Sequence, residues 1–63
     1  MAKEYALIKR FKTGHDVAYW ILGLKNQYGE YDTIVDGFNE NWVRAYMEEH
    51  RIKKYKLIEK CMD

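Results

Sequence analysis

The sequence contains no proline and only one cysteine, so two common means of stiffening a small domain are missing. Cys61 has no second cysteine to pair with, which excludes an intrachain disulfide and is typical of a protein in a reducing cytoplasm. No segment approaches the roughly 18 consecutive apolar residues of a membrane-spanning helix, and the first residues lack the apolar run of a signal peptide. We therefore expect a soluble, cytoplasmic protein that does not enter a membrane.

The sequence is also poor in the patterns from which active sites and metal centres are built. Its two histidines, His15 and His50, stand far apart, and the chain has no Cys-x-x-Cys or His-x-x-x-His motif. No activating motif accompanies Cys61, which we interpret as a small apolar residue on the inner face of a strand. The scattered glycines do not form a phosphate-binding loop. We predict a protein that is not an enzyme and that needs no cofactor or metal ion.

Aromatic residues, in contrast, are abundant. The 63 residues, which we expect to form a single domain over 1–63, include six tyrosines, two tryptophans and two phenylalanines. A chain this short buries only about 60% of its unfolded surface, whereas each aromatic ring can bury roughly 150–250 Å². The aromatic side chains exceed what one small core needs, so we expect the surplus on the surface or in an interface.

Charge is distributed unevenly along the chain. Residues 1–12 carry four cations and one carboxylate, residues 13–50 carry two cations and seven carboxylates, and residues 51–63 carry five cations and two carboxylates. The net charge of +1 neither indicates nor excludes a nucleic-acid partner. Both ends are therefore basic, and the middle is acidic.

Alternating apolar and polar residues predict a strand over 4–12, a third strand over 31–35 that ends at Asp36–Gly37, and a last strand over 53–61. Asn39 has the character of a helix N-cap, and an apolar stripe of Trp42, Val43, Tyr46 and Met47 follows it. This pattern predicts one helix between the third strand and the last.

Residues 16–28 fit two structures. On a helix, Val17, Trp20, Ile21, Leu24 and Tyr28 form an apolar stripe, whereas on a strand "VAYWILGL" is a β-rich run with apolar residues on both faces. We favour the strand, because a glycine in mid-segment disfavours a helix by about 1 kcal/mol relative to alanine. The expected fold is a small α+β domain with an antiparallel sheet and one helix packed on it, in the order β-β-β-α-β. The alternative is β-α-β-α-β.

The segments "YALIKRF", "YWILGLKNQYGEYDTIV" and "HRIKKYKLIEK" give a layout that resembles short accessory proteins of phages and mobile elements in low-GC bacteria. Members of that group are similar in having a strand, a turn, a "Y-x-L…N-x-x-G-E" pattern, a helix and a basic terminal strand. They carry a serine or threonine cap where this chain has Asp36–Gly37. The resemblance implies an accessory factor in the cytoplasm of a bacterial host, and some such factors inhibit host proteins.

The first functional hypothesis is protein binding, by a phage-type inhibitor or modulator of a host protein in defence or nucleic-acid processing. Aromatic side chains dominate interface hot spots, and an acidic surface can imitate nucleic acid toward a basic groove. We expect Trp20, Trp42 and Tyr46 to be in the core. The predicted contact residues are Tyr19, Tyr28, Glu30, Tyr31, Asp32, Asp36, Glu40, Glu48 and Glu49.

The second hypothesis is binding of nucleic acid or nucleotides through the basic strands. If the first and last strands are neighbours, one face combines Ile8 and Ile58 with Arg10, Lys12, Lys54, Lys56 and Lys60. Alternation places no base-stacking aromatic residue of these strands on that face, which weakens the hypothesis, and edge lysines also serve to prevent aggregation. A homo-oligomer, formed through the spare aromatic residues, is compatible with both hypotheses.

Overall fold

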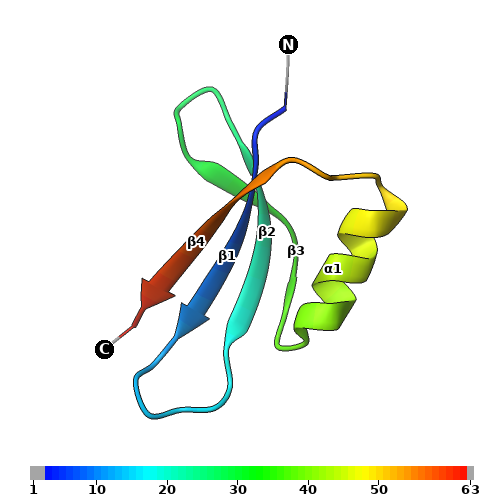
Figure 1. Cartoon of the computed structure of the whole chain (residues 1–63). Coiled ribbons are helices and arrows are strands. Elements are labelled where there is room, and N and C mark those ends of the chain that lie inside the picture. Colours follow the sequence, from blue (N-terminus) through cyan, green and yellow to red (C-terminus); the bar gives the residue numbers. More distant parts are fainter. Residues whose placement is uncertain (1–2, 63) are drawn as a thin grey trace.

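The computed structural model describes residues 3–62 and contains four strands and one helix (Figure 1). In chain order these are β1 (Tyr5–Phe11), β2 (Tyr19–Lys25), β3 (Tyr31–Gly37), α1 (Glu40–Glu49) and β4 (Tyr55–Cys61). The fold is α+β with the order β-β-β-α-β, which confirms the predicted class and element order.

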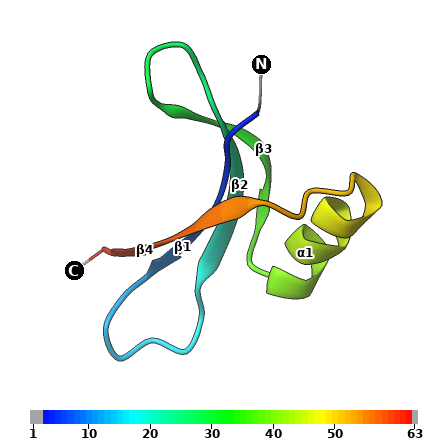
Figure 2. The same cartoon turned by 45° about the horizontal axis from the view of Figure 1, so that its top comes forward.

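The four strands form one mixed sheet with the spatial order β3-β2-β1-β4. β2 pairs antiparallel with both β1 and β3, whereas β4 pairs parallel with β1. The prediction of an antiparallel sheet was therefore wrong for this last pair. The reason is that β3 runs in the direction of β1, and α1 carries the chain back before β4 begins (Figures 1 and 2).

For residues 16–28 the sequence allowed either a helix or a strand. In the structure this segment contains strand β2, so the helical alternative is wrong. Its apolar residues alternate between the two faces of the sheet, as successive side chains of a strand do, and β2 lies between β1 and β3 in the sheet. The turn that follows is fixed by the Asn26 side chain, whose Oδ1 accepts hydrogen bonds from the backbone N–H groups of Tyr28 and Glu30 at 2.9 and 3.1 Å. Gly29 adopts a φ of 80° there, which glycine tolerates best.

The helix begins where the sequence predicts. The Oδ1 of Asn39 accepts a hydrogen bond from the backbone N–H of Trp42 at 3.3 Å, which caps the first turn. The helix ends at the cap residue His50, and Arg51 reverses the chain with a φ of 54°. No helix within residues 3–62 has the length and apolar character needed to cross a membrane.

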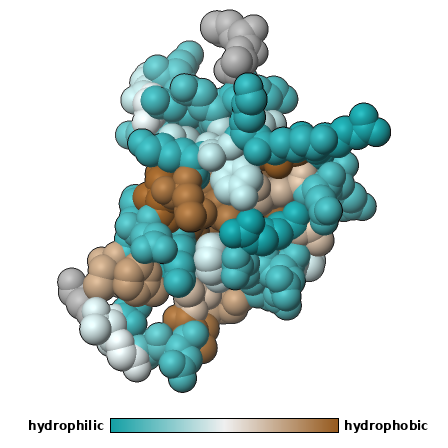
Figure 3. Space-filling view, in the orientation of Figure 1, coloured by the Kyte–Doolittle hydropathy of each residue, from teal (hydrophilic) through white to brown (hydrophobic). Residues whose placement is uncertain are grey.

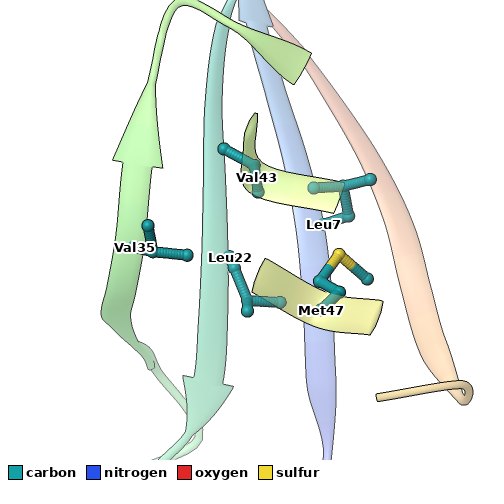
Figure 4. Packing of buried hydrophobic residues seen from close by; sticks show 5 residues of the cluster. All are labelled: Leu7, Leu22, Val35, Val43 and Met47. Atoms are coloured by element: carbon teal, nitrogen blue, oxygen red, sulfur yellow. The ribbon is translucent and has the colours of Figure 1, made fainter. Parts of the chain in front are cut away.

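The buried core lies between α1 and one face of the sheet. It consists of Leu7, Leu22, Val35, Val43 and Met47, which gather between the helix and the strands (Figure 4). Trp20 and Tyr46 pack against this cluster as predicted. Trp42 was also expected in the core, and this was wrong: its side chain is 56% exposed. Val43 and Met47 face the sheet, whereas Trp42 lies beside Gly37.

The helix packs on β2 and β3 and leaves the outer strand β4 without a cover. Leu57 of β4 is consequently 57% exposed. Cys61, which was predicted on an inner face, is also exposed, because it lies at the end of this outer strand, away from the helix. The two layers therefore overlap over part of the sheet only.

This partial overlap predicts different results for two leucine-to-alanine substitutions. Leu22 is fully buried, so Leu22→Ala should lower the free energy of unfolding by about 2–5 kcal/mol, enough to unfold much of a small domain. The matched substitution Leu57→Ala should lower it by less than about 1 kcal/mol. Urea denaturation followed by circular dichroism measures both, and an equal loss would contradict the described packing.

Candidate functional site

The sheet has one face without a helix, and we call it the open face. Strand register and side-chain alternation determine which residues it presents, with one extra residue in β3 at Ile34. The open face comprises Ala6, Ile8, Arg10, Tyr19, Ile21, Gly23, Lys25, Tyr31, Thr33, Asp36, Lys56, Ile58 and Lys60. All four strands contribute to it.

The parallel pairing of β1 with β4 brings the basic ends of the chain together. Arg10 lies beside Lys60, and Ile8 lies beside Ile58, in the register of these two strands. Lys56 occupies the same face two residues before Ile58. Of the remaining predicted cations, Lys12 follows the end of β1 and Lys54 precedes β4. The condition for the basic face, neighbouring first and last strands, is met in the structure.

Most cations of the open face are not neutralised. Lys25 forms an ion pair with Glu4, with 3.6 Å between Nζ and Oε2. The carboxylate of Asp36 accepts a hydrogen bond from the hydroxyl of Tyr19 and, among the described residues, pairs with no cation of this face. Within residues 3–62, no carboxylate lies within 4.0 Å of the charged groups of Arg10, Lys56 or Lys60. The face therefore carries an excess of positive charge.

Tyrosines of β2 and β3 also lie on the open face. Alternation in the first and last strands could not reveal them, because they belong to other strands. Tyr31 of β3 lies across Gly23 of β2, so close that a Cβ built on the glycine would be 2.8 Å from the Tyr31 Cβ. β1 and β4 place no aromatic residue on this face, as alternation predicted, but the expectation that the face as a whole lacks aromatic residues was wrong. The missed signal was Gly23 itself, since a glycine inside a strand often marks a close approach by a neighbour.

Tyr19 is held in place by two contacts at the end of the sheet. Its hydroxyl donates a hydrogen bond to Oδ2 of Asp36 at 2.7 Å, and its ring meets that of Phe38 edge to face, with centroids 4.8 Å apart. The hydrogen bond to Asp36 raises the pKa of Tyr19, with a smaller effect of desolvation. Phe38 is 69% exposed, so one end of the open face presents a flat apolar ring to solvent.

The predicted protein-contact residues do not share one surface. Asp36 lies on the open face and Glu30 borders it, whereas the predicted acidic residues of α1 lie on the opposite side of the sheet. Tyr28 is 78% exposed at the β2–β3 turn. Four of the predicted residues lie on the helix side: Asp32, Glu40, Glu48 and Glu49. Asp32 accepts a hydrogen bond from Asn26, and Glu40 forms a 2.7 Å ion pair with Arg44. Glu48 and Glu49 are exposed.

No three histidine, cysteine, aspartate or glutamate side chains gather into a metal-binding group in the part of the chain that the structure describes. The Sγ of Cys61 lies 3.5 Å from Oγ1 of Thr13, a polar neighbour that does not activate a thiol. The open face, with its cations and aromatic rings, is the surface with the clearest binding chemistry.

Comparison with protein-family models, curated proteins and solved structures found no match to this chain. The resemblance to accessory proteins of phages and mobile elements thus remains a prediction, as does the non-enzymatic character. The function is therefore inferred from the geometry and chemistry of the open face.

The contact between β2 and Tyr31 predicts the effect of a single added methyl group. Gly23→Ala places a Cβ against the Tyr31 Cβ, so it should destabilise the domain by about 1–3 kcal/mol and move Tyr31. In the control Gly37→Ala, the new Cβ would meet only the Trp42 ring at 3.6 Å, and stability should change by less than about 1 kcal/mol. Thermal unfolding and the NMR shifts of Tyr31 test this, and equal stability of both variants would refute the close approach.

Proposed function

We propose that this domain is a non-catalytic binding module that holds single-stranded nucleic acid on its open face. The observation that carries the proposal is a row of cations, without an ion-pair partner among residues 3–62, beside the half-buried Tyr31 on a sheet face without a helix. Arg10 and Lys60 stand side by side, and Tyr31 lies over the neighbouring strands. Proteins that bind single strands combine a basic surface along the backbone with aromatic rings on which bases stack.

The shape of the face favours a single strand over a duplex. It is an open sheet of seven-residue strands, and no helix or protruding ribbon of the described part of the chain stands on it to enter a major groove. The bases of a single strand, in contrast, can turn toward the protein and stack on Tyr31, Tyr19 or Phe38. Phosphates can then contact Arg10 and the lysines of β4.

The charge on the opposite side of the molecule also favours binding of nucleic acid to the open face. The surface of α1 carries Glu40, Glu48 and Glu49, and among residues 3–62 only Glu40 of these three forms an ion pair, with Arg44. A polyanion is repelled there and attracted to the open face, although the net charge of the chain is only +1. The separation of charge between two faces therefore matters more for binding than the total charge.

Binding of a labelled oligothymidine tests this proposal. Affinity should fall steeply with salt, and Lys60→Ala should weaken binding and reduce the slope of log K against log [salt] by about 0.7–1. The control is Lys53→Ala, an exposed lysine outside the open face, which should leave the slope unchanged. Fluorescence anisotropy at roughly 50–200 mM salt measures both. Equal effects of the two variants, or no binding at the lowest salt, would contradict the proposal.

A protein partner is the second candidate, and a different surface supports it. On the side that carries α1, Leu57 of β4 is 57% exposed, and β4 has a free edge. Figure 3 shows hydrophobic side chains at the surface over β4 with hydrophilic ones around them. An inhibitor or modulator of a host protein would use such a surface, since exposed apolar groups mark binding sites.

Affinity capture from a bacterial lysate, with and without nuclease, separates the two candidates. The nucleic-acid proposal predicts that nucleic acid is recovered and that it is lost at about 0.5 M salt, where exposed charges are screened. A single stoichiometric protein that survives nuclease and high salt would instead support the second candidate. Leu57→Glu should release such a protein, whereas Lys60→Ala should lower the amount of nucleic acid recovered.

A further inference from the structure

Two hollows of the molecular surface meet at Arg10. One has a volume of about 340 Å³, and its wall includes Arg10, Lys12, His15, Tyr19 and Phe38. The other has a volume of about 500 Å³, and its wall includes Ile8, Arg10, Ile21, Tyr31, Thr33 and Lys60. The guanidinium-bearing side chain of Arg10 thus belongs to both walls.

Each hollow offers an aromatic ring that is already held in place. In the first, the edge-to-face contact of Phe38 with Tyr19 and the hydrogen bond from Tyr19 to Asp36 fix the two rings. In the second, Tyr31 is fixed by its close packing on Gly23. Rings that are immobile before binding lose little conformational entropy when a ligand stacks on them.

Arg10 separates the two aromatic sites and carries a charge that no neighbour cancels. Its charged group has no carboxylate within 4.0 Å among residues 3–62. Ile8 and Arg10 are successive residues on one face of β1, about 7 Å apart, so the hollows follow one another along this strand. The order along the face is therefore an aromatic site, a cation and a second aromatic site.

We infer that the open face binds one dinucleotide step, with a base in each hollow and the linking phosphate on Arg10. This inference rests on the proposed function and adds the smallest unit that the face recognises. The first base stacks on Phe38 and the second on Tyr31. Lys60, which lies beside Arg10 in the strand register, meets the same linking phosphate, and Lys12, in the wall of the first hollow, meets the phosphate that precedes the step.

The linking phosphate provides the sharpest test. The probes are two thymidine dinucleotides that differ only in the linkage, a phosphodiester or an uncharged methylphosphonate, and NMR titration of the full chain gives each affinity. The wild type should bind the phosphodiester about tenfold more tightly than thymidine monophosphate and more tightly than the methylphosphonate. Arg10→Ala should weaken the phosphodiester about tenfold and leave the methylphosphonate unchanged, while the control Lys53→Ala should change neither.

The aromatic sites are tested with a second pair of variants. Phe38→Ala should weaken the phosphodiester dinucleotide roughly tenfold, the amount expected when one base loses its stacking partner. Phe38 is 69% exposed, so this variant should retain the fold, which its NMR spectrum verifies. The control Tyr28→Ala removes another exposed ring, at the β2–β3 turn, and should have no effect.

The outcomes distinguish this inference from the proposed function. If longer oligothymidines bind but the dinucleotide binds no better than the mononucleotide, the dinucleotide step is refuted and the proposed function stands. If Arg10→Ala weakens both linkages equally, Arg10 does not hold the linking phosphate, and the inference is again refuted. If no oligothymidine of any length binds at low salt, the proposed function fails, and this inference fails with it.

Discussion

The parallel pairing of β4 with β1 is the constraint on which the rest of the molecule depends. The helix carries the chain from one edge strand, β3, across the sheet to the opposite edge. Because β1 and β3 run in the same direction, the return through α1 makes β4 parallel to β1. This crossover places Arg10 beside Lys60 and so joins two basic segments from opposite ends of the sequence.

The same crossover divides the molecule into two unlike surfaces. The helix buries Val43 and Met47 over β2 and β3, and its exposed side carries carboxylates. The sheet face behind it collects cations from β1 and β4, while Leu57 remains uncovered next to the helix. A domain with a core of so few side chains can thus present a basic face for a polyanion and a separate apolar edge for a protein.

The aromatic residues have more than one structural role. Trp20 and Tyr46 enlarge the core, whereas Tyr19, Tyr31 and Phe38 stand on or beside the open face. Tyr31 also covers the centre of the open face, where Ala6 and Gly23 are buried without a helix above them. An aromatic side chain therefore covers part of the sheet and, in the proposed function, also offers a surface on which a base stacks.

The sequence alone determined the elements: alternation defined the strands, Asn39 marked the start of α1, and Gly23 with β-rich neighbours favoured a strand over a helix. These features are local, since they depend on backbone propensity and on the period of the side chains. The parallel β1–β4 pair, the exposure of Trp42 and the position of Tyr31 beside the basic row depended on contacts between distant segments. Only the tertiary structure decided them, because strand order and helix placement follow from how the whole chain buries its apolar surface.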